Sequence, residues 1–189
     1  MQRIFAAVKI LPDEGLIQLL KYMKQALVQD KVKWVDSGNM HITLKFFGET
    51  PEDKVEEIAK ALEKIVKPLA PQVFTLQCRG VGIFGSQYKP RVIWLGIKES
   101  FELQQLEKEV VKVIEPLGYL PDRQNFVPHL TLGRINFLND KKYFQHIIDS
   151  VKTFSAEPQR IPAFHLYESK LKPTGPEYSI INSYKLAES

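Results

Sequence analysis

The sequence contains a single cysteine, Cys78, among its 189 residues. One cysteine excludes an internal disulfide and any cysteine-rich zinc site, so we expect a reducing, cytoplasmic setting. No apolar run approaches the length of a transmembrane helix, and the apolar segment at the amino terminus is too short for a secretory signal. We therefore expect no contact with a membrane.

The sequence also lacks several motifs of cofactor and metal chemistry. It has neither the glycine patterns of nucleotide-binding loops nor the Gly-x-Ser-x-Gly of serine hydrolases, and no His-Glu-x-x-His. We therefore expect no cofactor. The composition, 44% hydrophobic and 25% charged, is that of a soluble globular protein. A net charge of +4 suits a polyanionic partner, although so small an excess is common in proteins that never meet nucleic acid.

A tetrapeptide pattern, His-aliphatic-Thr-Leu, occurs twice in the chain. Because successive side chains of a β-strand point to opposite faces, His41 and Thr43 would share one face, as would His129 and Thr131. The aliphatic residues between them would face a core. For one copy alone, an ordinary amphipathic strand would be the better explanation. Since two of the four histidines carry the pattern, we interpret the pair as a nearly symmetric functional site.

Periodicity and capping residues predict a mixed succession of helices and strands. Helices are expected to begin near Asp13, after an N-cap at Thr50, after Ser100, and after Asn139 or Asp140. Alternating β-formers predict strands at 3–10, 32–35, 40–47, 73–84, 91–97, 127–135, 161–171 and 178–186. Loops are expected at 118–125 and at two hairpin tips, 85–90 and 172–177.

The order of these elements repeats. Each motif strand is followed by a helix and then by a hairpin with a Lys/Pro/Gly tip, which predicts two α+β lobes related by a pseudo-twofold axis, with the motif strands facing each other. No linker separates the halves. We therefore expect residues 1–189 to form a single bilobal domain with one motif per lobe, at 41–44 and 129–132.

Two imidazoles that face one cleft can act as general base and general acid, because each titrates near neutral pH. Threonine hydroxyls beside them can donate hydrogen bonds to non-bridging phosphate oxygens. The pattern therefore favours phosphodiester hydrolysis without a metal. In the alternative, the two histidines bind zinc, but further ligands would have to come from scattered acidic residues. His146 and His165 are expected to be structural or surface residues.

The motifs and their surroundings resemble a known family. Residues 32–35 (VKWV) and 39–49 (NMHITLKFFGE) are similar to the first motif of the RNA 2′,3′-cyclic phosphodiesterases, or 2′-5′ RNA ligase-like proteins, in the two-histidine phosphoesterase superfamily. Residues 126–134 (FVPHLTLGR) resemble the second motif. The strand at 90–95 and the closing hairpin at 166–178 are also similar.

The resemblance implies a bilobal α+β fold in which mainly antiparallel sheets face a central cleft and helices lie outside. It implies hydrolysis of a terminal 2′,3′-cyclic phosphate on RNA to a 2′-phosphate, with His41 as proton donor and His129 as proton acceptor. It also implies 2′-5′ ligation as the reverse reaction. The expected partners are RNA ends with a cyclic phosphate, including tRNA fragments, and the expected state is a monomer.

Further site residues are assigned less directly. Arg134 matches a family arginine placed near the phosphate, yet strict alternation would turn it to the core unless Gly133 hosts a β-bulge. The alternative is a rim arginine unrelated to phosphate. Phe46 has the same offset in the first motif and could stack on a base, although alternation favours core packing. Trp34 and Tyr88 are further candidates for base stacking.

Two other functions remain open at this point. The same chemistry would serve a phosphodiesterase of small nucleotides, such as ADP-ribose cyclic phosphate or 2′-5′ oligoadenylate. A noncatalytic module that binds RNA ends could also retain the site. Intact His and Thr in both motifs argue against the second alternative, because binding alone does not need two titrating groups.

Overall fold

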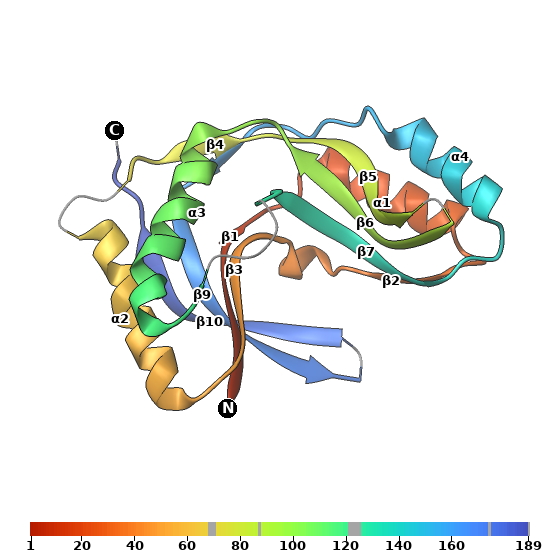
Figure 1. Ribbon diagram of the computed structural model, residues 1–189. Coiled ribbons are helices and arrows are strands. Elements are labelled where there is room, and N and C mark those ends of the chain that lie inside the picture. The colour runs from red at the N-terminus through yellow and green to blue at the C-terminus, as the bar shows by residue number, and fades with distance from the viewer. Residues whose placement is uncertain (68–70, 87, 121–125, 174, 189) are drawn as a thin grey trace.

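The structure is a computed structural model that describes residues 1–67, 71–86, 88–120, 126–173 and 175–188 (Figure 1). The loop expected at 118–125 lies largely outside these ranges. So do Gln87 and Thr174, at the tips of the two expected hairpins.

Two four-stranded sheets carry the two motifs. The first sheet has the order β10-β9-β1-β3 and the second β2-β7-β6-β5, and neighbouring strands are antiparallel throughout. The first is built from β1 (Gln2–Lys9), β3 (His41–Thr50), β9 (Ala163–Lys172) and β10 (Gly175–Lys185). The second is built from β2 (Lys31–Trp34), β5 (Cys78–Ser86), β6 (Lys89–Ile97) and β7 (His129–Phe137). A short ribbon pairs β4 (Phe74–Leu76) with β8 (Gln159–Ile161).

Helices cover the outer faces of both sheets (Figure 1). Side chains of Asp13, Ser100 and Asp140 accept hydrogen bonds from backbone amides of the first turn and so begin three of them. The helices are α1 (Glu14–Ala26), α2 (Glu52–Val66), α3 (Phe101–Ile114) and α4 (Lys141–Val151), with short 3-10 turns η1 (Ser37–Asn39) and η2 (Glu115–Leu117). Each α-helix buries an apolar stripe against the core.

The two lobes exchange helices. Although α1 follows β1 of the first sheet, it packs with α4 beside the second sheet. Although α3 follows β6 of the second sheet, it packs with α2 beside the first. Neither lobe is therefore a continuous segment of the chain, and one cluster of buried apolar side chains extends through both.

Three details differ from the sequence expectations. Thr50 does not cap α2: the N-cap position is Pro51, and the Thr50 hydroxyl instead donates to the Gly48 carbonyl at 3.1 Å. The strand expected at 73–84 is two strands, because Phe74 pairs with Ile161 in the ribbon whereas the strand from Cys78 pairs with β6. The strand expected at 161–171 likewise divides at Pro162, which has no amide hydrogen for a ladder.

Candidate active site

The two motif strands meet at the centre of the molecule, where β3 of the first lobe contacts β7 of the second (Figure 1). The aliphatic residues of both motifs are buried: Ile42 and Leu130 have no exposed surface. His41, Thr43, His129 and Thr131 are half-buried on the opposite faces of these strands. Strand alternation thus places one histidine and one threonine of each motif away from the core, as expected.

Both imidazoles are braced in the same way. The Nδ1 of His41 lies 2.7 Å from the carbonyl oxygen of Asn39, and the Nδ1 of His129 lies 2.9 Å from that of Val127. Because a carbonyl oxygen only accepts, each Nδ1 carries the hydrogen. Each Nε2 therefore accepts a proton when the ring is neutral and donates one when it is charged, as a general base and a general acid require.

Aromatic rings surround His41. The ring of Phe5 has its centroid 4.8 Å from the imidazole, and Tyr178 packs edge-on at 5.3 Å with an interplanar angle of 87°. Phe5 in turn stacks on Tyr167 at 5.1 Å. These contacts restrict the orientation of the imidazole from the side of β1, β9 and β10.

His129 has a different aromatic neighbour. Phe84 packs edge-on against it at 4.7 Å, and Phe84 also contacts Trp94 at 5.3 Å. The indole lies so close to Gly82 on the neighbouring strand that a Cβ atom at Gly82 would clash with it. Glycine at that position therefore lets Trp94 lie flat along the sheet beside the site.

The charges of two arginines act on the titrating groups around His41. Burial lowers the pKa of His41 below 6.5, the Asn39 hydrogen bond opposes this, and the charges of His129 and Arg134 lower it further. Burial raises the pKa of Tyr178, while Arg134 and Arg3 act in the opposite direction. Both arginines are therefore near enough to the His41 side of the site to act on its titrating groups.

A β-bulge in each motif strand explains the position of Arg134. In the pairing of β7 with β6, Thr131 lies opposite Trp94 and Gly133 opposite Ile93, so Leu132 is an extra residue. The bulge reverses the alternation after Leu132, and Arg134 is exposed while Gly133 is buried. The bulge expected near Gly133 is present, and Arg134 does not face the core.

The first motif strand has the same irregularity. Thr43 pairs with Ala7 and Lys45 with Ala6, so Leu44 is the extra residue. Phe46 is consequently 46% exposed, and the guanidinium carbon of Arg3 lies 4.8 Å above its ring. The expectation that core packing is the better interpretation of Phe46 is wrong, because the bulge turns the side chain outward.

The other two aromatic candidates lie elsewhere. Trp34 packs against the hydrophobic core, where a Cβ atom at Gly133 would approach its ring to 3.1 Å. Tyr88 is 83% exposed beside the tip of the β5–β6 hairpin. In the described part of the chain, no ring contact joins either side chain to a motif histidine, so their role in base stacking stays a prediction.

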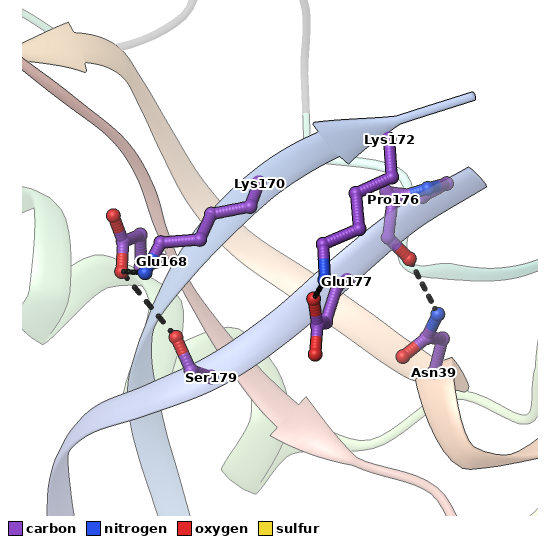
Figure 2. A network of polar contacts seen from close by, with 7 residues as sticks. All are labelled: Asn39, Glu168, Lys170, Lys172, Pro176, Glu177 and Ser179. Carbon is purple, nitrogen blue, oxygen red and sulfur yellow. Dashed lines mark hydrogen bonds and ion pairs between the residues drawn. The ribbon is translucent and has the colours of Figure 1, made fainter. Parts of the chain in front are cut away.

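A polar network ties the first motif to the closing hairpin (Figure 2). The side-chain amide of Asn39 donates to the carbonyl of Pro176 at 2.9 Å. On the hairpin itself, Lys172 forms an ion pair with Glu177, and Glu168 lies 3.2 Å from Lys170. Ion pairs in contact with solvent add little stability, but the Asn39 bond holds in place the segment whose carbonyl accepts from His41.

Several residues of the site escape sequence reasoning. The sequence predicts only a turn at Asn39. It predicts ordinary strand positions for Arg3, Phe5 and Phe84. Their contacts depend on which strands pair, and in what register. The one available signal is the alternation of the first strand, which puts Arg3 and Phe5 on a common face.

Two further observations concern partners. Among the described residues, no group of three or more His, Cys, Asp or Glu side chains is arranged to hold a metal ion. The expectation of metal independence stays a prediction. None of the helices in those residues combines the length and apolarity that crossing a membrane requires.

Comparisons with known proteins agree with this architecture. The family model described as LigT-like phosphoesterase matches residues 8–94 and again 95–178. The chain is 33% identical over 187 residues to an RNA 2′,3′-cyclic phosphodiesterase of Archaeoglobus fulgidus, covering 97% of this chain and 99% of the relative. It is 30% identical over 186 residues to one of Methanothermobacter thermautotrophicus, covering 97% and 98%.

Solved structures show the same fold. The crystal structure of TT0787 of Thermus thermophilus superposes with a TM-score of 0.76 at 23% identity, over 97% of both chains. The structure of Escherichia coli LigT complexed with 3′-AMP gives 0.75 at 22% identity, over 98% of both. These likenesses confirm the expected bilobal α+β fold. Since the family model matches both halves of the chain in succession, the protein belongs to the LigT-like phosphoesterase family.

Proposed function

We propose that this chain is an RNA 2′,3′-cyclic phosphodiesterase that uses its two motif histidines as general acid and general base. The observation that carries the proposal is the matched bracing of both imidazoles at Nδ1, on two strands that meet between the lobes. It leaves two Nε2 atoms to exchange protons with one substrate. The curated relatives named RNA 2′,3′-cyclic phosphodiesterase support the same substrate class.

The reaction follows from these groups. His129 Nε2 takes a proton from water while the water oxygen forms a bond to phosphorus. The pentacovalent intermediate then loses the 3′ oxygen, which takes the Nε2 proton of His41, and a 2′-phosphate remains. Thr43 and Thr131 would donate to the non-bridging oxygens, and Arg134 would offset their charge. An RNA 5′-hydroxyl in place of water would give a 2′-5′ linkage by the same steps.

The role of His41 as acid rests on the family resemblance. In the free protein its lowered pKa favours the neutral ring at neutral pH. A bound phosphate anion acts in the opposite direction, because an opposite charge nearby favours the charged imidazole. Substrate binding would therefore protonate His41 and prepare it to donate.

The proposal is tested by incubating the protein, in the presence of a chelator, with an RNA that ends in a 2′,3′-cyclic phosphate. We expect conversion to a 2′-phosphate, identified by the products. His41→Ala and His129→Ala should each lower turnover by a factor on the order of a hundred or more. Full activity in either variant, or loss of activity that zinc restores after chelation, would contradict the mechanism.

The same experiment with small nucleotides separates the remaining substrates. Hydrolysis of ADP-ribose cyclic phosphate or 2′-5′ oligoadenylate in preference to RNA would move the proposal to a small-nucleotide enzyme. Binding of RNA ends without turnover would indicate a noncatalytic module. Recognition of tRNA fragments, a monomeric state and a cytoplasmic location remain predictions.

A further inference from the structure

A small cavity of about 90 Å³ opens beside His41. It lies between the end of β1, the turn η1 and the strands β9 and β10, and it is lined by Lys9, Gly38–His41, Tyr167, Tyr178 and Ile180. Pockets that enclose a drug-sized ligand begin at roughly 300 Å³. The cavity therefore has room for one group of a larger ligand rather than for the whole ligand.

Lys9 supplies positive charge to this cavity. It is the cross-strand partner of His41 in the β1–β3 pairing, so the two side chains share a face. Within the part of the chain that the structure describes, the Lys9 ammonium has no acidic or hydrogen-bonding partner. Its charge also acts on His165 of the neighbouring strand β9. The pKa of His165 is lowered mainly by burial and, to a smaller extent, by the charge of Lys9.

The second lobe differs at the two corresponding positions. The partner of His129 is Gly96, where the partner of His41 is Lys9. The partner of Thr131 is Trp94, where the partner of Thr43 is Ala7. The indole also covers Gly96, since a Cβ atom there would lie 3.2 Å from the ring. The two lobes therefore differ next to their histidines. The residue paired with His41 is the cation Lys9, whereas the residue paired with His129 is Gly96, which the Trp94 indole covers.

Resting on the proposed function, we infer that the cavity is a phosphate subsite for the 5′-phosphate of the nucleotide that carries the cyclic phosphate. In that nucleotide the two phosphates are separated by a single ribose, and a cyclic phosphate at His41 places the second one beside it. Lys9 offers a point charge, and the phenols of the tyrosines that line the cavity can donate hydrogen bonds. The upstream RNA strand would then leave the site over the lobe that contains His41.

The wall of the cavity is preformed. Asn39, which lines it, is held by its bond to the Pro176 carbonyl and in turn braces His41. A site whose groups are already ordered spends less of its binding free energy on ordering them. The subsite should therefore strengthen the binding of RNA relative to nucleosides without a conformational change.

The test compares two substrates, adenosine 2′,3′-cyclic phosphate and the same molecule with a 5′-phosphate. We expect wild-type kcat/KM to be about fivefold higher for the phosphorylated substrate, the size of one partly exposed charge pair. Lys9→Gln should remove this preference, and Lys9→Arg should retain it. Lys108→Gln, which removes an exposed charge from α3, is the matched control and should also retain it.

The outcomes are distinct. Equal kcat/KM for the two substrates in the wild-type protein, or an unchanged preference in Lys9→Gln, would overturn the subsite while the proposed activity stands. Hydrolysis of neither substrate, and of no RNA cyclic phosphate, would overturn the proposed function and the subsite with it. Raised salt should reduce the wild-type preference toward that of Lys9→Gln, because screening weakens an exposed charge contact.

Discussion

The side-chain amide of Asn39 donates a 2.9 Å hydrogen bond to the backbone carbonyl of Pro176, on the far hairpin of the chain (Figure 2). The carbonyl of the same Asn39 accepts from Nδ1 of His41, and Tyr178 packs edge-on against that imidazole. The corresponding carbonyl of the second motif belongs to Val127, which is 59% exposed. Both histidines thus donate from Nδ1 to a backbone carbonyl, but only the carbonyl of Asn39 belongs to a residue whose side chain is bonded to the closing hairpin among the described residues.

We predict that Asn39→Ala lowers kcat on adenosine 2′,3′-cyclic phosphate, which has no 5′-phosphate, about fivefold with little change in KM, the scale of one lost hydrogen bond. The Asn39 carbonyl, which accepts the hydrogen bond from His41 Nδ1, would no longer be held by the bond to the Pro176 carbonyl. Because the Asn39 hydrogen bond raises the pKa of His41, its weakening should lower that pKa further. Steady-state kinetics and an NMR titration of the His41 ring measure both effects.

Two variants accompany this measurement. Asn39→Asp keeps the size of the side chain but removes the donor, so its kcat should fall as in Asn39→Ala, while its carboxylate should raise the pKa of His41 instead of lowering it. Asn182→Ala removes an exposed amide from β10 and serves as the control. An unchanged His41 titration in Asn39→Ala would show that the anchor does not position the imidazole.

The threonine hydroxyls give a second prediction. Thr43→Val and Thr131→Val keep the β-branched shape and remove only the donor, so the fold should be retained. Each lost hydroxyl contact to a charged phosphate should raise the activation free energy by about 1.5 to 3 kcal/mol. The measurement is kcat/KM, with unfolding curves to verify the fold.

Thr75→Val is the matched control, because Thr75 is exposed on β4 of the separate ribbon. It makes the same chemical change outside the site. Normal kinetics in both motif variants would place the two hydroxyls outside the reaction.

A third prediction concerns stability and pH. The pKa values of His41 and His165 lie below 6.5 in the folded protein, chiefly because of burial. As the pH falls through 6.5, these two histidines bind more protons in the unfolded chain than in the folded protein. The free energy of unfolding should therefore decrease as the pH is lowered. Well above 6.5, where the unfolded chain is also unprotonated at both positions, neither histidine should contribute to the slope.

Denaturant unfolding at several pH values measures this slope. His41→Ala and His165→Ala should each flatten part of it, whatever they do to the absolute stability. His146→Ala, which removes an exposed imidazole from α4, controls for the loss of an imidazole as such. Equal slopes in His41→Ala and the wild-type protein would contradict the effect of burial at His41.

Alternation along the strands predicted correctly which side chains of the motifs are buried, as far as the bulges. It placed the histidines and threonines opposite the buried aliphatic residues, but beyond Leu44 it assigned Phe46 to the core. The bulge arises from how β3 pairs with β1, and a strand read alone does not reveal its partner's register. Lys45 shows the same difficulty: it is buried and donates to the Leu120 carbonyl, 2.9 Å away, where its charge predicts exposure.

The exchange of helices between the lobes escaped prediction for a related reason. The apolar stripe of α1 shows that the helix covers a sheet, but it does not show which one. The sequence repeat nevertheless predicted two lobes with one motif each, although the hairpin that follows each motif joins the sheet of the other: β5 and β6 lie with β7, and β9 and β10 lie with β3. What periodicity cannot supply is the pairing of segments distant in the chain, and the Asn39–Pro176 bond and the Lys9 cavity both depend on it.

The fourth prediction separates the roles of the two histidines. If His41 protonates the departing 3′ oxygen, it becomes dispensable when the leaving group needs no proton. A cyclic substrate with sulfur at the 3′ position meets this condition, since a thiolate is a far weaker base than an alkoxide. We therefore expect His41→Ala to recover much of its lost rate on the 3′-thio substrate.

His129→Ala should show no such recovery, because water still needs a base whichever group departs. The comparison uses each variant's rate relative to the wild-type protein on the oxygen and sulfur substrates, so intrinsic differences between the substrates cancel. Because the two histidines are braced alike, and the lowered pKa of His41 by itself suits a base, geometry does not decide between the assignments. Rescue of His129→Ala instead of His41→Ala would exchange the two roles and leave the paired acid–base mechanism in place.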